Sequence, residues 1–171
     1  YVTTESFIDK ELIGYGIDFG FTNDPTAMIE VRMQDGELWI KEVIYDTGLT
    51  NQDISNRMDI ADISRGTLIV ADSAEPKSIE ELRRLRWTVD GVKKGKDSIM
   101  FGINLLKGYT INVHAGSTNL IKELEQYKWK VDRNGDSLNV PIDNYNHAID
   151  ALRYIIMHKF SKKGYGQYKV I

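Results

Sequence analysis

The first quarter of the chain most restricts the fold, because it reads as consecutive strands joined by short connections. The runs at 12–20 (LIGYGIDFG), 26–34 (TAMIEVRMQ) and 36–46 (GELWIKEVIYD) are rich in β-branched and aromatic residues. The dipeptide Asp35-Gly36 lies between the last two runs and is typical of a tight hairpin turn. We therefore predict three consecutive antiparallel strands.

Helical and strand patterns alternate in the rest of the chain. A short apolar run from Leu68 to Ala71 has no polar alternation, which indicates a strand covered on both faces. Three antiparallel strands followed by this alternation predict an α/β fold with a mixed sheet and helices on both faces. The expected later elements are a helix at 51–63, a strand at 68–72, a helix at 77–86, a strand at 87–92, a helix at 96–108, a strand at 109–114, a helix at 117–127, a hairpin at 126–141 and a final helix at 143–160.

Length and composition indicate one domain. With 171 residues, 42% of them hydrophobic, we expect a single core over 13–160, a linker or tail at 1–12 and a C-terminal tail at 161–171.

The absence of cysteine excludes disulfides and thiolate metal sites. No apolar run approaches the ~20 residues that span a bilayer, so we expect an intracellular protein without a membrane partner. Because the chain begins with Tyr1, we expect a piece of a longer polypeptide.

Two acids share one context. Asp18 and Asp72 each end an apolar run and are each followed at once by a turn. In an open α/β sheet, ligands bind beyond the strand ends, and two carboxylates brought together there are stabilised by a divalent cation. Oxygen ligands favour Mg²⁺ or Mn²⁺ over zinc. The alternative is that each acid only forms a turn or caps the next helix.

The last predicted helix carries the remaining candidate ligands. His147 and Asp150 are three residues apart and therefore share one helix face, and Asp143 lies four residues before His147. Asp18 and Asp72, with one carboxylate and the imidazole of this helix, suffice to hold two ions about 4 Å apart, an arrangement that hydrolyses phosphodiesters. Asp143 is also a plausible helix cap and His147 a plausible packing histidine, whereas Asp150 has no local structural role in mid-helix.

Two further residues keep open roles. Glu75 is either a partner of the helix dipole or a metal ligand, in a supporting or alternative position. Arg153 is either an ion-pair partner of Asp150 or a contact for a phosphate, and the ion pair is favoured.

Basic residues gather in two places although the net charge is −3. Residues 83–96 hold six basic residues against one acid, which favours contact with a polyanion over a merely solvated helix face. The hairpin at 126–141 adds further basic and aromatic residues and is expected to guide duplex DNA beside the site, or else only to cover the core. The expected DNA-binding residues are Arg84, Lys93, Lys94, Lys96, Lys128 and Lys130.

The motifs GIDFGFTNDPTA, VADSAEPKSIEEL, GVKKGKDSIMFGINLL and LNVPIDNYNHAIDALRY stand in this order between Gly14 and Phe160. In order and spacing they resemble the C-terminal nuclease domain of the tailed-bacteriophage terminase large subunit, which has an RNase H-like (retroviral-integrase-like) fold. The resemblance implies that Asp18, Asp72 and Asp150 are metal-binding catalytic acids and that His147 joins them.

The same resemblance implies a two-metal endonuclease that cuts concatemeric double-stranded viral DNA during packaging. It further implies an N-terminal ATPase domain, a portal protein and a small terminase subunit as partners, in the host cytoplasm at the procapsid portal. No G-x-x-x-x-G-K-[ST] loop occurs in this sequence. The alternatives are a Holliday-junction resolvase or transposase-type nuclease of the same fold, a nucleotide binder of the sugar-kinase type, and a non-catalytic portal-docking module.

Overall fold

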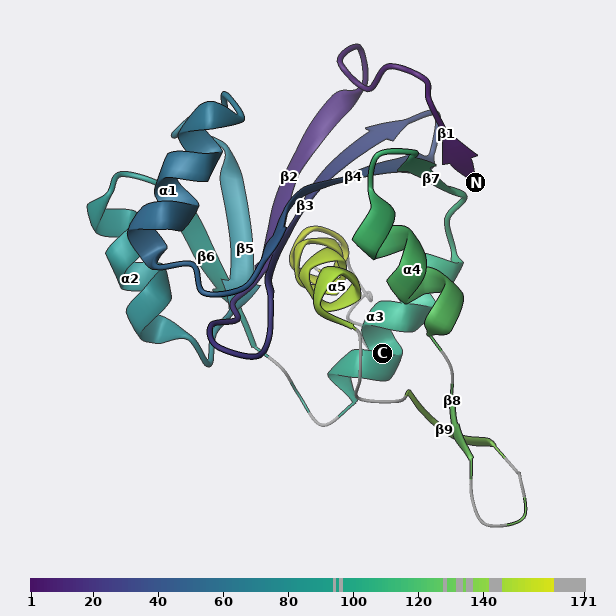
Figure 1. Cartoon of the computed structure of the whole chain (residues 1–171). Coiled ribbons are helices and arrows are strands. Elements are labelled where there is room, and N and C mark those ends of the chain that lie inside the picture. Colours follow the sequence, from purple (N-terminus) through teal and green to yellow (C-terminus); the bar gives the residue numbers. More distant parts are fainter. Residues whose placement is uncertain are drawn as a thin grey trace, which may run out of the picture.

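A seven-stranded mixed sheet forms the centre of the computed structural model (Figure 1). The structure describes residues 1–93, 95, 97–127, 129–131, 134, 137–141 and 146–161, with only the backbone at 129–131 and 137–141. In the described residues the sheet order is β1-β7-β4-β3-β2-β5-β6. Its strands are β1 (Val2–Thr3), β2 (Glu11–Asp18), β3 (Thr26–Gln34), β4 (Glu37–Asp46), β5 (Leu68–Asp72), β6 (Thr88–Val92) and β7 (Ile111–His114).

The three antiparallel strands predicted from the sequence are confirmed. Strands β2, β3 and β4 pair antiparallel in chain order, and β5, β6 and β7 add parallel pairs on either side. The turn between β3 and β4 has positive φ at both central residues, 52° at Asp35 and 80° at Gly36. This is the hairpin conformation that the Asp-Gly dipeptide favours, because glycine adopts positive φ without a steric cost.

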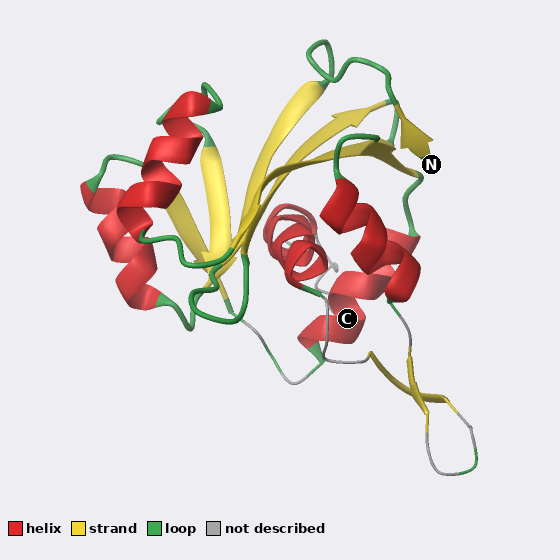
Figure 2. Ribbon diagram, viewed as in Figure 1, coloured by secondary structure: helices red, strands yellow, loops and turns green. Residues whose placement is uncertain are grey.

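Helices cover both faces of the sheet, as predicted (Figure 2). One face packs against α1 (Asn51–Ile60) and α2 (Pro76–Arg84) through a buried apolar cluster that includes Ile17 and Ile54. The opposite face packs against α3 (Ser98–Lys107), α4 (Thr118–Gln126) and α5 (His147–Phe160) through a second cluster. Helix α5 lies directly over β2, β3 and β5, so its residues reach the centre of the sheet.

The segment 1–12, expected to be a linker or tail, carries structure of its own. Val2 pairs with Val113 of β7, which makes β1 an edge strand of the sheet. Phe7 is buried, and its ring lies edge-on to that of Trp39 at 5.4 Å between centroids. At the other end, 162–171 of the expected tail lie outside the described residues. Within the described residues, no helix has the length and apolar character needed to cross a membrane.

The expected hairpin is present as β8 (Trp129–Val131) paired antiparallel with β9 (Ser137–Pro141). The start of the following helix differs from the prediction. Helix α5 begins at His147 with Asn146 as its N-cap residue, so Asp143, which lies outside the described residues, is not the cap we expected. The physical reason is that the acceptors for the first helical N–H groups come from elsewhere in the fold, as described below.

Candidate functional site

Two predicted site residues stand at the same edge of the sheet. Strands β2 and β5 are parallel neighbours with Ile17 opposite Ala71, so Asp18 and Asp72 each follow one residue later at their carboxyl ends. Side chains alternate along a strand, and Ile17 and Ala71 both belong to the cluster under α1 and α2. Asp18 and Asp72 therefore lie on the other face, which α5 covers.

Helix α5 approaches β2 very closely. Gly16 allows this contact, because a Cβ at that position would lie 1.8 Å from the carbonyl oxygen of Ala151. The approach brings the first two turns of α5 to the end of β2. His147, Asp150 and Tyr154 recur at intervals of three and four residues and share the face of α5 that meets Asp18.

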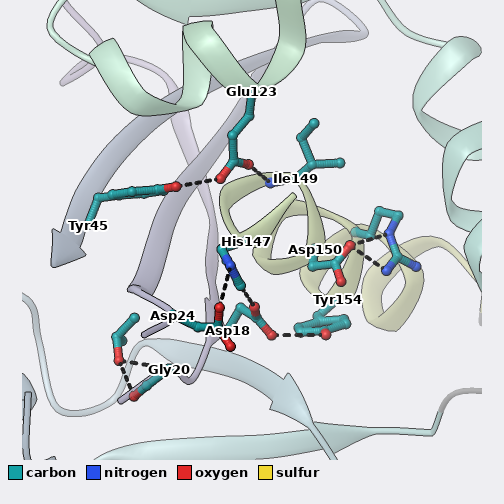
Figure 3. Close-up of polar contacts among 11 residues, drawn as sticks. Asp18, Gly20, Asp24, Tyr45, Glu123, His147, Ile149, Asp150 and Tyr154 are labelled. Atoms are coloured by element: carbon teal, nitrogen blue, oxygen red, sulfur yellow. Dashed lines mark hydrogen bonds and ion pairs between the residues drawn. The ribbon is translucent and has the colours of Figure 1, made fainter. Parts of the chain in front are cut away.

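Asp18 is held on both of its carboxylate oxygens (Figure 3). Its Oδ2 lies 3.0 Å from Nδ1 of His147, and its Oδ1 accepts a hydrogen bond of 3.1 Å from the Tyr154 hydroxyl. The side chains of Asp18 and His147 are 18% and 22% exposed. Asp18 and His147 are therefore in direct contact, in a position that solvent still reaches.

The charges of three carboxylates act on the Tyr154 hydroxyl. Burial of the ring is the largest cause that raises the Tyr154 pKa, and the negative charges of Asp18, Asp150 and Asp72 raise it further. These acids come from β2, α5 and β5, and they act on one buried oxygen only because the three elements meet there. The convergence of Asp18, Asp72 and Asp150 on one metal site stays a prediction.

Asp150 is paired with Arg153. Its Oδ1 accepts hydrogen bonds from Nε and Nη2 of Arg153 at 3.2 and 2.7 Å. The Arg153 side chain is only 1% exposed, so the favoured ion-pair role of this arginine is realised and its guanidinium is too buried to meet a DNA phosphate. Arg153 sets the orientation of the Asp150 carboxylate.

Asp72 also forms a local turn, which was the alternative considered for it. Its Oδ1 accepts a hydrogen bond of 3.0 Å from the amide of Ala74. This turn-forming contact does not exclude a second role, since a carboxylate has about four acceptor positions.

His147 faces a second acid as well. Its Nε2 lies 3.6 Å from Oδ1 of Asp24, in the loop that follows β2. The hydrogen bond to Asp18 is the largest cause that raises the pKa of His147 above its ordinary value. The Asp24 loop, the start of α1 and the start of α2 line a cavity of about 610 Å³, and Glu75 is on its wall. Glu75 makes no side-chain hydrogen bond that caps α2.

The donor set suits a hard divalent cation in its chemistry. Among the described residues, however, no three His, Asp or Glu side chains are gathered closely enough to hold an ion. Both oxygens of Asp18 are engaged by protein donors, and one oxygen of Asp150 is engaged by Arg153. Carboxylate oxygens with one imidazole nitrogen fit Mg²⁺ or Mn²⁺, and each oxygen of Asp18 keeps a second acceptor position for an ion.

The predicted DNA-binding residues are only partly described. Arg84 pairs with Glu80 one helical turn earlier at 3.1 Å, which matches the solvated-face alternative, while Lys93 is exposed. Lys130 is in β8, where only the backbone is described. Their role toward DNA stays a prediction, and the remaining candidates lie outside the described residues: Lys94, Lys96 and Lys128.

Sequence reasoning missed three residues of this region. Tyr154 had a readable signal, because it lies four residues after Asp150 on the same helix face. Asp24 and the buried Glu123 of α4 had none, because their contacts to α5 depend on tertiary packing alone.

Comparison with known proteins gives one consistent result. Residues 18–158 match the family described as the terminase RNase H-like domain. The large terminase subunit of Bacillus phage SPP1 is 31% identical over 89% of this chain and 37% of its own length. The PBSX phage terminase large subunit of Bacillus subtilis is 27% identical over 87% of this chain and 35% of its own length. This chain therefore spans a little over a third of these relatives.

The fold gives the same match. The crystal structure of the g2p (large terminase) nuclease domain from bacteriophage SPP1 with bound Mn superposes with a TM-score of 0.80 at 25% identity, covering 92% of this chain and 95% of that one. The RNase H-like fold expected from the sequence is confirmed by this likeness.

Proposed function

Because this chain belongs to the terminase RNase H-like domain family, we propose that it is a metal-dependent endonuclease that cuts double-stranded viral DNA during genome packaging. The observation that carries the proposal is the position of Asp18 and Asp72 at the neighbouring carboxyl ends of β2 and β5, on the sheet face that α5 covers with His147, Asp150 and Tyr154. Three acids from two strands and one helix at a partly exposed edge have no shared structural purpose. The SPP1 nuclease domain with bound Mn supports a divalent cation as their partner.

The four predicted site residues have distinct parts in this proposal. Asp18, Asp72, Asp150 and His147 would hold two ions. Mg²⁺ or Mn²⁺ bound there would supply polarisation of the scissile phosphodiester and activation of water for hydrolysis. Arg153 orients the Asp150 carboxylate and the Tyr154 hydroxyl orients that of Asp18, so the ligands are held by neighbours that do not contact the metal.

Plasmid cleavage tests this proposal directly. The 171-residue chain with Mn²⁺ is expected to nick and linearise supercoiled DNA, and Asp18→Asn and Asp72→Asn are expected to abolish cutting while leaving the fold intact. Asp59→Asn is the matched control, because Asp59 is an exposed acid of α1 that pairs with Arg65. An Asp72→Asn variant that keeps most of its cutting activity would refute the assignment of Asp72.

A substrate panel separates the alternatives. Linear and supercoiled duplexes are expected to be cut in preference to four-way junctions, whereas a resolvase prefers the junctions. Calorimetric titration with Mn²⁺ addresses the portal-docking alternative, since a docking module needs no ion bound through these acids.

The partners follow from the family and from the length of the relatives. We propose that an ATPase domain on the same polypeptide, a portal protein and a small terminase subunit act with this domain on concatemeric DNA, in the host cytoplasm at the procapsid portal. The partial coverage of the SPP1 and PBSX large subunits supports a larger polypeptide.

A further inference from the structure

The N-terminus of α5 lacks a local cap. Asn146 is its N-cap residue and makes no side-chain hydrogen bond to the helix. The first turns of any α-helix leave backbone N–H groups without intrahelical acceptors. Here those turns carry His147 and Asp150, so whatever accepts these N–H groups also determines where two site residues lie.

A buried carboxylate from another helix supplies the acceptor. Oε2 of Glu123, on α4, accepts a hydrogen bond of 3.0 Å from the amide of Ile149. Oε1 of Glu123 accepts a hydrogen bond of 2.8 Å from the Tyr45 hydroxyl on β4 (Figure 3). Glu123 is only 2% exposed. One side chain thus joins the sheet, α4 and the start of α5.

Helix α4 is itself fastened to the sheet by a second carboxylate. Oε2 of Glu42 on β4 accepts from the amide of Leu120, and its Oε1 accepts from Nδ2 of Asn119, both at 2.8 Å. The hydroxyl of Ser117, the N-cap residue of α4, makes no hydrogen bond to its own helix and accepts one of 3.0 Å from the amide of Glu42. Two carboxylate caps therefore connect β4 to α4 and α4 to α5.

Capping α5 with the buried Glu123 carboxylate costs more free energy than a cap at the surface would. A Ser or Asp at the N-cap position satisfies the same N–H groups at the surface, without burying a charge. A local cap moves with its own helix, however, and fixes nothing relative to the sheet. A cap supplied by α4 and held by Tyr45 fixes the start of α5 relative to β4.

We propose that Glu123 is a positioning residue that fixes the first turn of α5, and with it His147 and Asp150, in the geometry that binds metal. This inference rests on the proposed metal-dependent function. It concerns a residue outside the proposed ligand set, which acts through the backbone of Ile149.

The test compares variants of the 171-residue chain. Glu123→Ala removes the cap, Glu123→Gln keeps a neutral acceptor, and Tyr45→Phe removes one anchor of the carboxylate. Ser55→Ala is the control, because it removes a buried hydrogen bond to Trp87 under the other face of the sheet, away from α5. Two quantities are measured: amide hydrogen exchange at Ile149 in metal-free protein, and calorimetric Mn²⁺ affinity.

We expect Glu123→Ala to exchange faster at Ile149 and to lose about tenfold or more in Mn²⁺ affinity, as typical for residues that support metal ligands. Glu123→Gln and Tyr45→Phe change both quantities in the same direction by less. Ser55→Ala is expected to lose thermal stability and to keep wild-type Mn²⁺ affinity. If Glu123 had only a structural role, Glu123→Ala would show the same result as Ser55→Ala.

A folded Glu123→Ala with wild-type Mn²⁺ affinity overturns the inference. If that variant does not fold, unchanged exchange and affinity in both Glu123→Gln and Tyr45→Phe overturn it instead. Wild-type protein that binds no Mn²⁺, or an Asp18→Asn variant that binds it equally well, defeats the proposed function. The two failures are therefore distinct.

Discussion

The hydroxyl of Tyr154 donates a hydrogen bond of 3.1 Å to Oδ1 of Asp18, a residue 136 positions earlier in the chain. This bond connects α5 to the carboxyl end of β2 at the carboxylate that we propose as a metal ligand. We expect Tyr154→Phe to lower Mn²⁺ affinity and plasmid cutting about tenfold, because the Asp18 carboxylate loses one of the two partners that orient it.

Tyr15→Phe is the control for this substitution. Tyr15, on β2, is a buried tyrosine like Tyr154 on α5. Its hydroxyl donates a hydrogen bond of 3.2 Å to Glu30, which is not a site residue. Calorimetry and plasmid nicking compare the two variants. Equal losses in both would mean that Tyr154 acts only on stability.

Removal of Asp150 is expected to affect stability as well as cutting. In Asp150→Ala the buried guanidinium of Arg153 loses its partner, and breaking a buried pair in this way costs roughly 3–5 kcal/mol. Nη1 of Arg153 is already buried without a hydrogen-bond partner in the described part of the chain. Urea unfolding measures this loss, which Asp72→Asn is not expected to share.

The double variant Asp150→Ala with Arg153→Met tests the cause of that loss. Methionine fills much of the space of the arginine stem without a charge, so stability is expected to recover while cutting stays absent. Failure of the double variant to regain stability would show that Asp150 supports the fold by something other than its pair with Arg153.

Gly16→Ala is expected to disturb the contact between β2 and α5. The added Cβ would lie 1.8 Å from the backbone oxygen of Ala151, so the helix must move. We expect a loss of about 3 kcal/mol or more in the free energy of unfolding, at the upper end of overpacking effects, together with loss of cutting.

Gly66→Ala provides the comparison, since its Cβ would meet only the Ser64 hydroxyl at 4.0 Å. Thermal unfolding of both variants is the measurement. A Gly16→Ala protein as stable as Gly66→Ala would contradict the close approach of α5 to β2.

The Glu123 carboxyl predicts a defined dependence of stability on pH. Burial raises its pKa above the ordinary value of 4.5, against hydrogen bonds from Ile149, Tyr45 and Ala148 that favour the charged form. Between the unfolded and the folded pKa, the folded chain binds more protons than the unfolded chain. The free energy of unfolding therefore falls as pH rises through that window.

The measurement uses Glu123→Gln as a reference that does not titrate at this position. The difference in unfolding free energy, wild type minus variant, should decrease as pH rises from below 4.5 through the folded pKa and should be constant above it. A difference that grows with pH would mean that the folded pKa lies below its ordinary value.

Local pattern was enough to predict most of the elements. The strand expected at 26–34 has the observed bounds of β3, and the hairpin after it has the predicted turn. Both depend on neighbours in sequence, namely side-chain alternation and the positive φ of Asp35 and Gly36. The start of α5 was misplaced because its acceptor is Glu123, which sequence patterns near Asp143 do not report.

The sequence by itself determined the order of strands and helices, and it put Asp18 and Asp72 at the ends of two apolar strands, because these features depend on residues within a few positions of each other. Only the tertiary structure decided that Tyr154 contacts Asp18, that Arg153 holds Asp150 and that Glu123 caps α5. Such contacts depend on how closely packed surfaces meet, as at Gly16, and a side-chain pattern along one segment carries no information about the segment that will cover it.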